Sequence, residues 1–180
     1  MKFFVLGILF VIAIKGLFVF FTSICVPATG GAIFTRTHPS MIKKILENIK
    51  LEPNQVVYDL GCGDGRFLRE VAKRYNVRAI GFEINPWAYF LARIYNLFSR
   101  AKVKVVFANF WKKKVCDANL IFCYLFPDVM RKLEKKLERE LKPGTLVVSC
   151  NFPLPDWRPE KIIRAAFPYN DLIYIYQFRP

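Results

Sequence analysis

A glycine-rich segment between Val57 and Arg66 carries the residues best suited to bind a ligand. It contains glycine at every second position, at Gly61, Gly63 and Gly65, where an apolar run ends and a helical pattern begins. A turn between a strand and a helix needs fewer glycines than this. Glycine also lets the backbone approach a bound molecule that any side chain would block. The segment is therefore predicted to be a ligand-binding loop.

The charge of this loop indicates which ligand it binds. The dinucleotide pattern G-x-G-x-x-G requires glycine where Arg66 stands. Asp59 and Asp64 flank the loop, and two carboxylates would repel a pyrophosphate. S-adenosylmethionine carries a sulfonium and an ammonium and no phosphate, so its charge matches an acidic glycine loop. We therefore predict that Asp59, Asp64 and the three glycines bind S-adenosylmethionine.

Residues after the next two predicted strands complete this site. Glu83 ends the second strand about 20 residues beyond the loop, where an acid binds ribose hydroxyls in Rossmann-like sites. Asn109 and Phe110 follow the third strand and are placed to bracket an adenine with an amide and an aromatic ring. Taken singly, Glu83 is also explained as a surface charge, Asn109 as a turn former and Phe110 as a core residue. Together they favour a nucleoside-containing cation over NAD.

The elements that position these residues alternate between strand and helix. Five strands are predicted over Gln55–Leu60, Val77–Glu83, Val103–Phe107, Asn119–Tyr124 and Thr145–Cys150. Four helices are predicted over Pro39–Lys50, Arg66–Tyr75, Pro86–Phe98 and Pro127–Leu141. Such alternation gives an α/β, Rossmann-like, mostly parallel sheet with helices on both faces. The last two runs, Lys161–Ala166 and Asp171–Phe178, have no helix between them and predict an antiparallel hairpin at the sheet edge.

An apolar segment, Phe3–Cys25, precedes these elements. Its length of about 23 residues is enough to cross ~30 Å of hydrocarbon. Lys15 interrupts it at a cost of roughly 2.5–3.5 kcal/mol, which the surrounding apolar side chains outweigh. We predict a transmembrane anchor over residues 1–25, a linker and clamp loop over 26–38, and the catalytic domain over 39–180. A signal peptide and an interfacial or core helix are the alternatives.

Charge around this segment predicts the side on which the domain lies. Arg36, Lys43 and Lys44 follow the segment, whereas only Lys2 precedes it, so the positive-inside rule leaves the domain in the cytoplasm of a single-pass protein of the cell membrane. The whole chain has 28 basic and 14 acidic residues. This excess attracts nucleic acid, anionic lipid or acidic protein surfaces. The single histidine excludes a histidine-rich metal site, and no metal is predicted.

Several motifs resemble those of the lysine methyltransferases that modify the ATP synthase c-subunit and the adenine nucleotide translocase, with their small prokaryotic relatives. The motifs cover residues 58–66, 81–87, 109–111, 133–141 and 152–157. The resemblance implies a class I methyltransferase fold in which Asp59 and the three glycines hold the methionine part of the cofactor. It further implies that Glu83 holds the ribose, and Asn109 with Phe110 the adenine. Members often carry a proline-rich clamp stretch that residues 34–39 lack, except for Pro39.

A methyl acceptor is expected beside the aromatic run that follows the fourth strand. A lysine with a pKa near 10.4 is only about 0.04% neutral at pH 7, and a poorly hydrated pocket would lower that pKa. Tyr124 could accept an ammonium hydrogen bond or orient the amine, although core packing explains it equally well. Phe126, Asn151 and Trp157 are further candidates for the substrate pocket.

The leading hypothesis is a membrane-anchored protein-lysine N-methyltransferase. Its expected partners are membrane lipid, through the N-terminal helix, and a protein substrate, for which the anchor favours a membrane-associated one. A lipid amine, a quinone-type small molecule or RNA is the alternative acceptor, and charge alone favours RNA. A hypothesis of another class is a non-catalytic module that binds S-adenosylmethionine.

Overall fold

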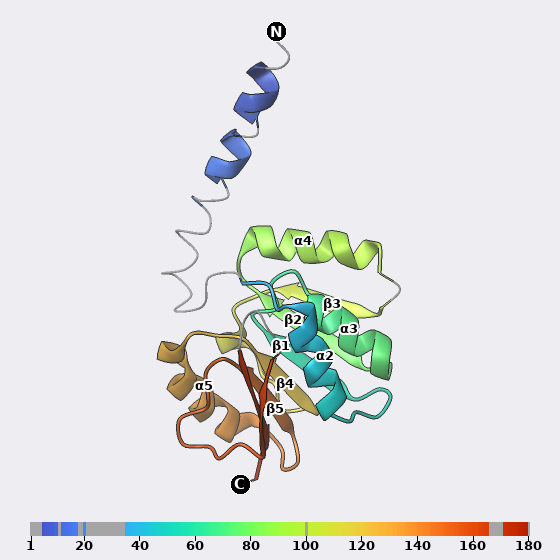
Figure 1. Cartoon of the computed structure of the whole chain (residues 1–180), viewed down its shortest axis with the longest axis vertical. Coiled ribbons are helices and arrows are strands. Elements are labelled where there is room, and N and C mark those ends of the chain that lie inside the picture. The colour runs from blue at the N-terminus through green and yellow to red at the C-terminus, as the bar shows by residue number, and fades with distance from the viewer. Residues whose placement is uncertain are drawn as a thin grey trace.

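The computed structural model describes residues 5–10, 12–17, 20, 35–99, 101–165 and 171–179 (Figure 1). Within the predicted anchor, residues 5–10 and 12–17 are helical, and the remainder lies mostly outside the described residues, as does most of the predicted linker. Across these described ranges, no helix combines the length and the apolar character needed to traverse a bilayer.

The described part of the domain contains one sheet of seven strands. They are β1 (Val56–Leu60), β2 (Arg78–Glu83), β3 (Val103–Phe107), β4 (Leu120–Cys123), β5 (Leu146–Cys150), β6 (Lys161–Arg164) and β7 (Leu172–Gln177). Their spatial order is β3-β2-β1-β4-β5-β7-β6. The pairs among β1 to β5 are parallel, whereas β7 runs antiparallel to both β5 and β6. The predicted class I, Rossmann-like sheet with a terminal antiparallel hairpin is therefore confirmed.

Helices cover both faces of this sheet (Figure 1). They are α2 (Pro39–Asn48), α3 (Arg66–Tyr75), α4 (Pro86–Leu97) and α5 (Pro127–Glu140), with a 3-10 turn, η1 (Phe110–Lys112). The start of α4 is fixed by Asn85, whose side-chain oxygen accepts hydrogen bonds from the backbone amides of Trp87 and Ala88. Pro86 then occupies the first turn, where no amide hydrogen is needed.

Alternate residues of each central strand enter two separate hydrophobic cores. Val57 belongs to the core that α2, α3 and Ala92 of α4 complete, and Tyr58 to the core beneath α5. The parallel strands β1, β2 and β4 end together, with Leu60 opposite both Phe82 and Cys123. The segments that follow these strands consequently meet at one edge of the sheet, which is where ligands bind in open α/β sheets.

Candidate functional site

The glycine loop turns back tightly at the end of β1. Gly61, Gly63 and Gly65 have φ angles of 88°, 55° and 73°, in the left-handed region that glycine enters without a steric penalty. The amides of Gly61 and Cys62 both donate to the carbonyl oxygen of Phe82, at 2.9 and 3.0 Å. The three predicted glycines are thus required by the backbone, which is held against the end of β2.

A fourth glycine, Gly81 in β2, lets the loop sit this close. A Cβ atom there would lie 2.5 Å from Cys62 Sγ and 2.6 Å from Leu68 Cδ1, nearer than any real contact. In the sequence, Gly81 stood out only as part of a family motif, with no role assigned to it. An isolated glycine inside a strand often marks such a close approach, so the signal was present.

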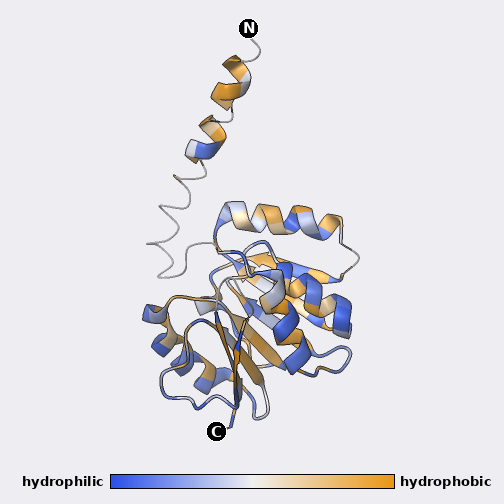
Figure 2. Ribbon diagram, in the orientation of Figure 1, coloured by the Kyte–Doolittle hydropathy of each residue, from blue (hydrophilic) through white to orange (hydrophobic). Residues whose placement is uncertain are grey.

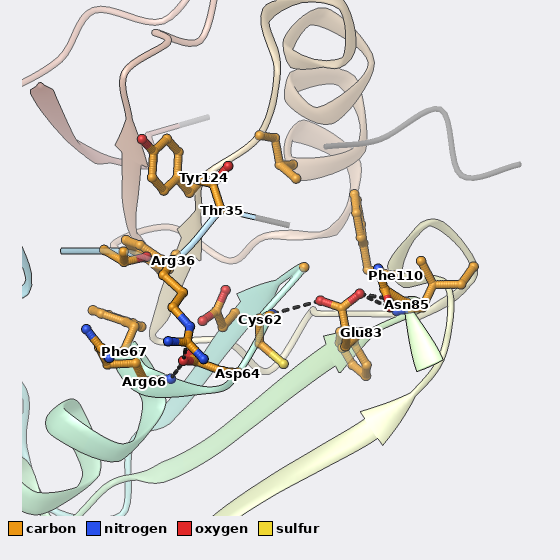
Figure 3. A pocket seen from close by; sticks show the side chains of 18 of the residues that line it. Thr35, Arg36, Cys62, Asp64, Arg66, Phe67, Glu83, Asn85, Phe110 and Tyr124 are labelled. Carbon is orange, nitrogen blue, oxygen red and sulfur yellow. Dashed lines mark hydrogen bonds and ion pairs between the residues drawn. The ribbon is translucent and has the colours of Figure 1, made fainter. Parts of the chain in front are cut away.

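Glu83 connects the loop to the carboxyl end of β2 (Figure 3). Its Oε2 accepts a hydrogen bond of 2.7 Å from the amide of Gly63. Its Oε1 accepts hydrogen bonds of 2.8 and 2.7 Å from the amides of Ile84 and Asn85. Burial raises the pKa of Glu83, and these three backbone hydrogen bonds oppose the rise. The carboxylate is therefore both buried and fixed in orientation.

Two more carboxylates lie buried beside Glu83. Burial, followed by the charges of Glu83 and Asp64, raises the pKa of Asp59 well above its usual range. Asp64 Oδ1 accepts a hydrogen bond of 3.1 Å from the amide of Arg66. Asp64 Oδ2 lies 3.2 Å from Arg36 Nε as an ion pair, but the two groups lack hydrogen-bond geometry. This arrangement gathers three acidic side chains at the loop.

These groups surround a pocket that opens to solvent. It is lined by residues 35–37, 59, 61–64, 66–67, 82–85, 108–110, 122 and 124–125. The lining contains three carboxylates, those of Asp59, Asp64 and Glu83, against the two guanidinium groups of Arg36 and Arg66. A cation bound here would offset the burial of Asp59. The pocket therefore fits S-adenosylmethionine, whose sulfonium and ammonium are cationic, better than a phosphate-bearing ligand.

Asn109 and Phe110 also line the pocket, beyond the end of β3. Ala108 donates a hydrogen bond of 2.9 Å to the carbonyl oxygen of Glu83, which joins this segment to β2. Asn109 Oδ1 accepts a hydrogen bond of 3.0 Å from the amide of Trp111 and so caps η1. The side-chain oxygen of Asn109 thus already has a structural role, which leaves its amide hydrogens for a ligand.

Tyr124 lines the pocket at the end of β4 (Figure 3). Its hydroxyl accepts a hydrogen bond of 2.9 Å from Asn151 Nδ2. Asn151 reaches it from the end of β5 with a φ of 67°. Burial, then the charges of Asp171 and Cys150, raises the pKa of Tyr124, so the hydroxyl keeps its proton at neutral pH. Tyr124 can consequently orient an amine but cannot serve as a general base.

The other two predicted pocket residues lie elsewhere. Phe126 precedes α5 and does not line the pocket. Trp157 stacks on Phe178 at 5.2 Å between ring centroids, and its Nε1 donates to Glu138 of α5. The segment before Trp157 is held there because Glu134 accepts a hydrogen bond of 2.8 Å from the amide of Asp156. The structure therefore brings Asn151 to Tyr124 but does not bring Phe126 or Trp157 to the pocket.

The clamp segment contributes pocket residues that the sequence did not predict as part of the site. Thr35, Arg36 and Thr37 line the pocket, and Arg36 additionally donates to the Tyr95 hydroxyl at 3.3 Å. The position of this segment was predicted, but its departure from the proline-rich pattern concealed which side chains take part. Within the described ranges no group of three or more histidine, cysteine, aspartate or glutamate residues is placed to hold a metal ion.

Comparison with known proteins finds relatives that match most of the chain. Residues 59–161 match the model of a family described as the ANTKMT methyltransferase domain. A protein-lysine N-methyltransferase of Saccharolobus islandicus (strain REY15A) is 35% identical over 147 residues, which cover 79% of this chain and 91% of that protein. The adenine nucleotide translocase lysine N-methyltransferase of Mus musculus is 35% identical over 125 residues, 68% of this chain and 54% of that protein. The ATP synthase c-subunit lysine N-methyltransferase of Homo sapiens is 30% identical over 141 residues, which cover 77% of this chain and 57% of that protein.

This chain thus spans little more than half the length of these two mammalian relatives. Among solved structures, an RNA methyltransferase from Salinibacter ruber in complex with S-adenosyl-L-homocysteine has a TM-score of 0.73 and 28% identity, and the match covers 79% of this chain and 93% of that one. Together with the acidic pocket, these likenesses show that the protein is a methyltransferase and that its cofactor is S-adenosyl-L-methionine.

Proposed function

We propose that this chain, which belongs to the ANTKMT methyltransferase domain family, is a membrane-anchored protein-lysine N-methyltransferase. The observation that carries the lysine acceptor is the likeness to the Saccharolobus islandicus enzyme, which extends over 91% of that protein. Because so little of that relative lies outside the match, no separate substrate domain is needed to explain its acceptor. The same compact arrangement is proposed here.

The cofactor supplies an electrophilic methyl group, and the pocket residues hold it in place. We assign Asp59, Asp64 and the three loop glycines to its methionine part, where the carboxylates compensate the cationic groups. All of these residues except Gly65 line the pocket. Glu83 is assigned to the ribose hydroxyls, since its carboxylate is already oriented by three backbone amides. Asn109 and Phe110 are assigned to the adenine. These assignments follow the order of the strand ends along the sheet edge.

The acceptor amine is proposed to enter beside Tyr124. A lysine must be neutral before it attacks, so its proton leaves to solvent as the amine enters the pocket. The Tyr124 hydroxyl accepts one hydrogen bond from Asn151 and retains a lone pair and its own proton. It can therefore accept a hydrogen bond from the amine and direct the nitrogen lone pair at the methyl group. Because charge moves rather than forms, positioning and exclusion of water supply most of the rate gain.

The anchor is proposed to be the apolar segment of residues 1–25, with the domain on the cytoplasmic side of the cell membrane. Its support is the apolar run from Phe3 to Cys25 and the basic residues that follow it. A protein carried on a membrane in this way meets membrane-associated acceptors more often than soluble ones. The proposed partners are thus membrane lipid and a protein substrate that is itself membrane-associated.

RNA is the second candidate acceptor. Its support is the likeness to the Salinibacter ruber structure and the net charge of +14. Phosphate contacts from lysine and arginine supply most non-specific affinity for nucleic acid, so a basic surface favours this acceptor. The lysine acceptor is preferred because the match to the Saccharolobus islandicus protein has the higher identity.

A labelling experiment separates the acceptors. The full chain is incubated with radiolabelled S-adenosylmethionine and with membrane and soluble extracts of cells that lack it. Label that stays in a protein band after solvent extraction and ribonuclease treatment supports the proposal. Label removed by ribonuclease indicates RNA, and label in the solvent phase indicates a lipid or quinone acceptor. Cofactor binding without any transfer would indicate a non-catalytic module. Glu83→Ala serves as the inactive control.

A further inference from the structure

Helix α4 presents its small residues to the sheet and its large apolar residues to solvent. Ala88 and Ala92 are fully buried, whereas Phe90, Leu97 and Phe98 are 54%, 79% and 85% exposed. Trp87, which lies on the same side at helical spacing, is 37% exposed. Figure 2 shows α4 along the outside of the domain, with hydrophobic residues interrupted by hydrophilic ones. A surface helix of a globular protein ordinarily turns its large apolar residues toward the core. The exposed apolar face of α4 therefore indicates an interaction surface.

Basic residues border one end of the α4 face (Trp87, Phe90, Leu97 and Phe98). The sequence from Ile84 to Val103, which contains α4, has three basic residues and no aspartate or glutamate. Beside the end of α4 lies a hollow lined by Arg66, Arg69, Lys73, Tyr95, Phe98 and Ser99. Glu70, an acid on the same helix as these cations, is paired with Lys73 at 2.9 Å. An apolar face bordered by cations matches the chemistry of an anionic lipid surface.

The α4 face also lies beside the segment through which the chain enters the domain. Arg36 donates to the Tyr95 hydroxyl of α4 at 3.3 Å and pairs with Asp64 of the glycine loop at 3.2 Å. One residue therefore joins α4, the entry segment and the rim of the cofactor pocket. The chain from residue 35 onward therefore enters the domain beside α4.

We propose that the α4 face docks the domain onto an anionic phospholipid bilayer. Trp87, Phe90, Leu97 and Phe98 enter the boundary between headgroups and acyl chains, and the basic residues of the hollow contact lipid phosphates. This surface is additional to the proposed anchor, because α4 lies inside the catalytic domain. Docking holds the rim of the cofactor pocket near the bilayer, so the acceptor lysine is expected close to a membrane surface.

Tryptophan fluorescence in vesicles tests the docking. The full chain is prepared with Trp111→Phe and Trp157→Phe, which leaves Trp87 as the reporter. The matched control carries Trp87→Phe and Trp111→Phe, which leaves Trp157 beside α5. Both are reconstituted into phosphatidylcholine vesicles with brominated acyl chains, with or without phosphatidylserine. We expect the emission of Trp87 to shift to the blue and to be quenched, more strongly with phosphatidylserine, while that of Trp157 stays unchanged. An unquenched Trp87 in vesicles that carry the protein would overturn the proposal.

A surface variant provides a second measurement. Phe90→Ser, Leu97→Ser and Phe98→Ser are combined, and Ile162→Ser is the control because Ile162 is 56% exposed on β6 at the opposite edge of the sheet. Each change is introduced into the chain whose one tryptophan is Trp87 and reconstituted into the brominated phosphatidylserine vesicles, and we expect the triple variant to lose most of the quenching of Trp87 while the control keeps it. Cofactor binding should be unchanged in both. A dimer that the triple variant abolishes, together with an unquenched Trp87, would make the face a protein interface and overturn the proposal. Neither readout needs methyl transfer, so each stands whether or not lysine is the acceptor.

Discussion

The amide of Gly63 donates a hydrogen bond of 2.7 Å to Glu83 Oε2, and this contact joins the glycine loop to the end of β2. The same carboxylate is assigned to the cofactor ribose, so one side chain shapes the loop and binds the ligand. A fixed carboxylate loses no rotational freedom when the ligand arrives. The loop and the acid that follows it along the chain thus act as one unit.

Glu83→Gln should weaken cofactor binding by about 10- to 100-fold, because a hydrogen bond to a charged group contributes roughly 1.5–3 kcal/mol. The amide of glutamine also places a donor where Gly63 or the pair Ile84 and Asn85 already donates. Isothermal titration calorimetry with S-adenosylhomocysteine measures the change. Glu160→Gln, on the surface near Arg179, should bind like the unmodified chain. If both variants bind the cofactor with equal affinity, the Glu83 carboxylate does not bind the cofactor.

Asp59→Asn should stabilise the cofactor-free protein at neutral pH by on the order of 1–3 kcal/mol. Burial and the neighbouring carboxylates raise the pKa of Asp59, so its ionisation in the folded state is unfavourable. A carboxyl with a raised folded pKa contributes stability below its unfolded pKa and loses it as pH rises through the folded pKa. The difference in melting temperature between Asp59→Asn and the unmodified chain should therefore shrink as the solution is acidified.

Differential scanning calorimetry over a pH series measures this difference. Asp156→Asn is the control, because that carboxylate is solvent-exposed and forms an exposed ion pair with Arg131. Added cofactor should reduce the difference in melting temperature between Asp59→Asn and the unmodified chain at neutral pH, because its cationic groups favour the ionised form of Asp59. A melting temperature of Asp59→Asn equal to or below that of the unmodified chain at neutral pH would contradict the account.

Much of this architecture could be predicted because local signals agreed with tertiary needs. The spacing of Gly61, Gly63 and Gly65 predicted a ligand-binding loop, and the backbone at all three glycines is left-handed. The alternation of apolar runs predicted the parallel sheet, and Pro86 after Asn85 predicted where α4 begins. Glu83 lies beside the loop for the topological reason that adjacent parallel strands end together.

Long-range packing was harder to predict. Trp157 was expected in a substrate pocket because its aromatic motif follows a strand end. Instead, Glu134 of α5 binds the backbone amide of Asp156, which lies 22 residues later in the sequence, and so holds this segment against α5. Gly81, as a glycine inside a strand, indicated a close approach, but neither it nor Arg36 showed which residues it contacts. The exposed face of α4 was likewise hidden, since helical periodicity identifies an apolar stripe without showing which side the sheet covers.

Gly81→Ala should destabilise the protein by about 1–3 kcal/mol, the usual cost of overpacking. The added methyl group would overlap Cys62 and Leu68, so either the loop or α3 must move away from β2. Cofactor affinity should fall along with stability. Thermal unfolding and calorimetry measure both quantities. Gly16→Ala is the control, because its Cβ would meet no atom within 4 Å. Unchanged values for Gly81→Ala would show that the loop does not depend on this contact.

Tyr124→Phe should reduce kcat by about tenfold, the effect of one orienting hydrogen bond, while cofactor affinity stays the same. Because Tyr124 remains protonated, the pH dependence of the rate should keep its shape in the variant. Steady-state kinetics on the acceptor identified by labelling provide the test. Tyr58→Phe is the control, since its hydroxyl contacts Asp117 and does not line the pocket. A rate profile that loses an ionisation in Tyr124→Phe would instead make Tyr124 a general base.

The acceptor atom is the central claim, and amino-acid analysis of the labelled product tests it most directly. The protein fraction methylated by the full chain with radiolabelled S-adenosylmethionine is hydrolysed to free amino acids and separated by chromatography. The account predicts that the label co-elutes with mono-, di- or trimethyllysine and is absent when Glu83→Ala replaces the unmodified chain. Label in another methylated amino acid, or none in the protein fraction beside labelled RNA or lipid, would contradict it.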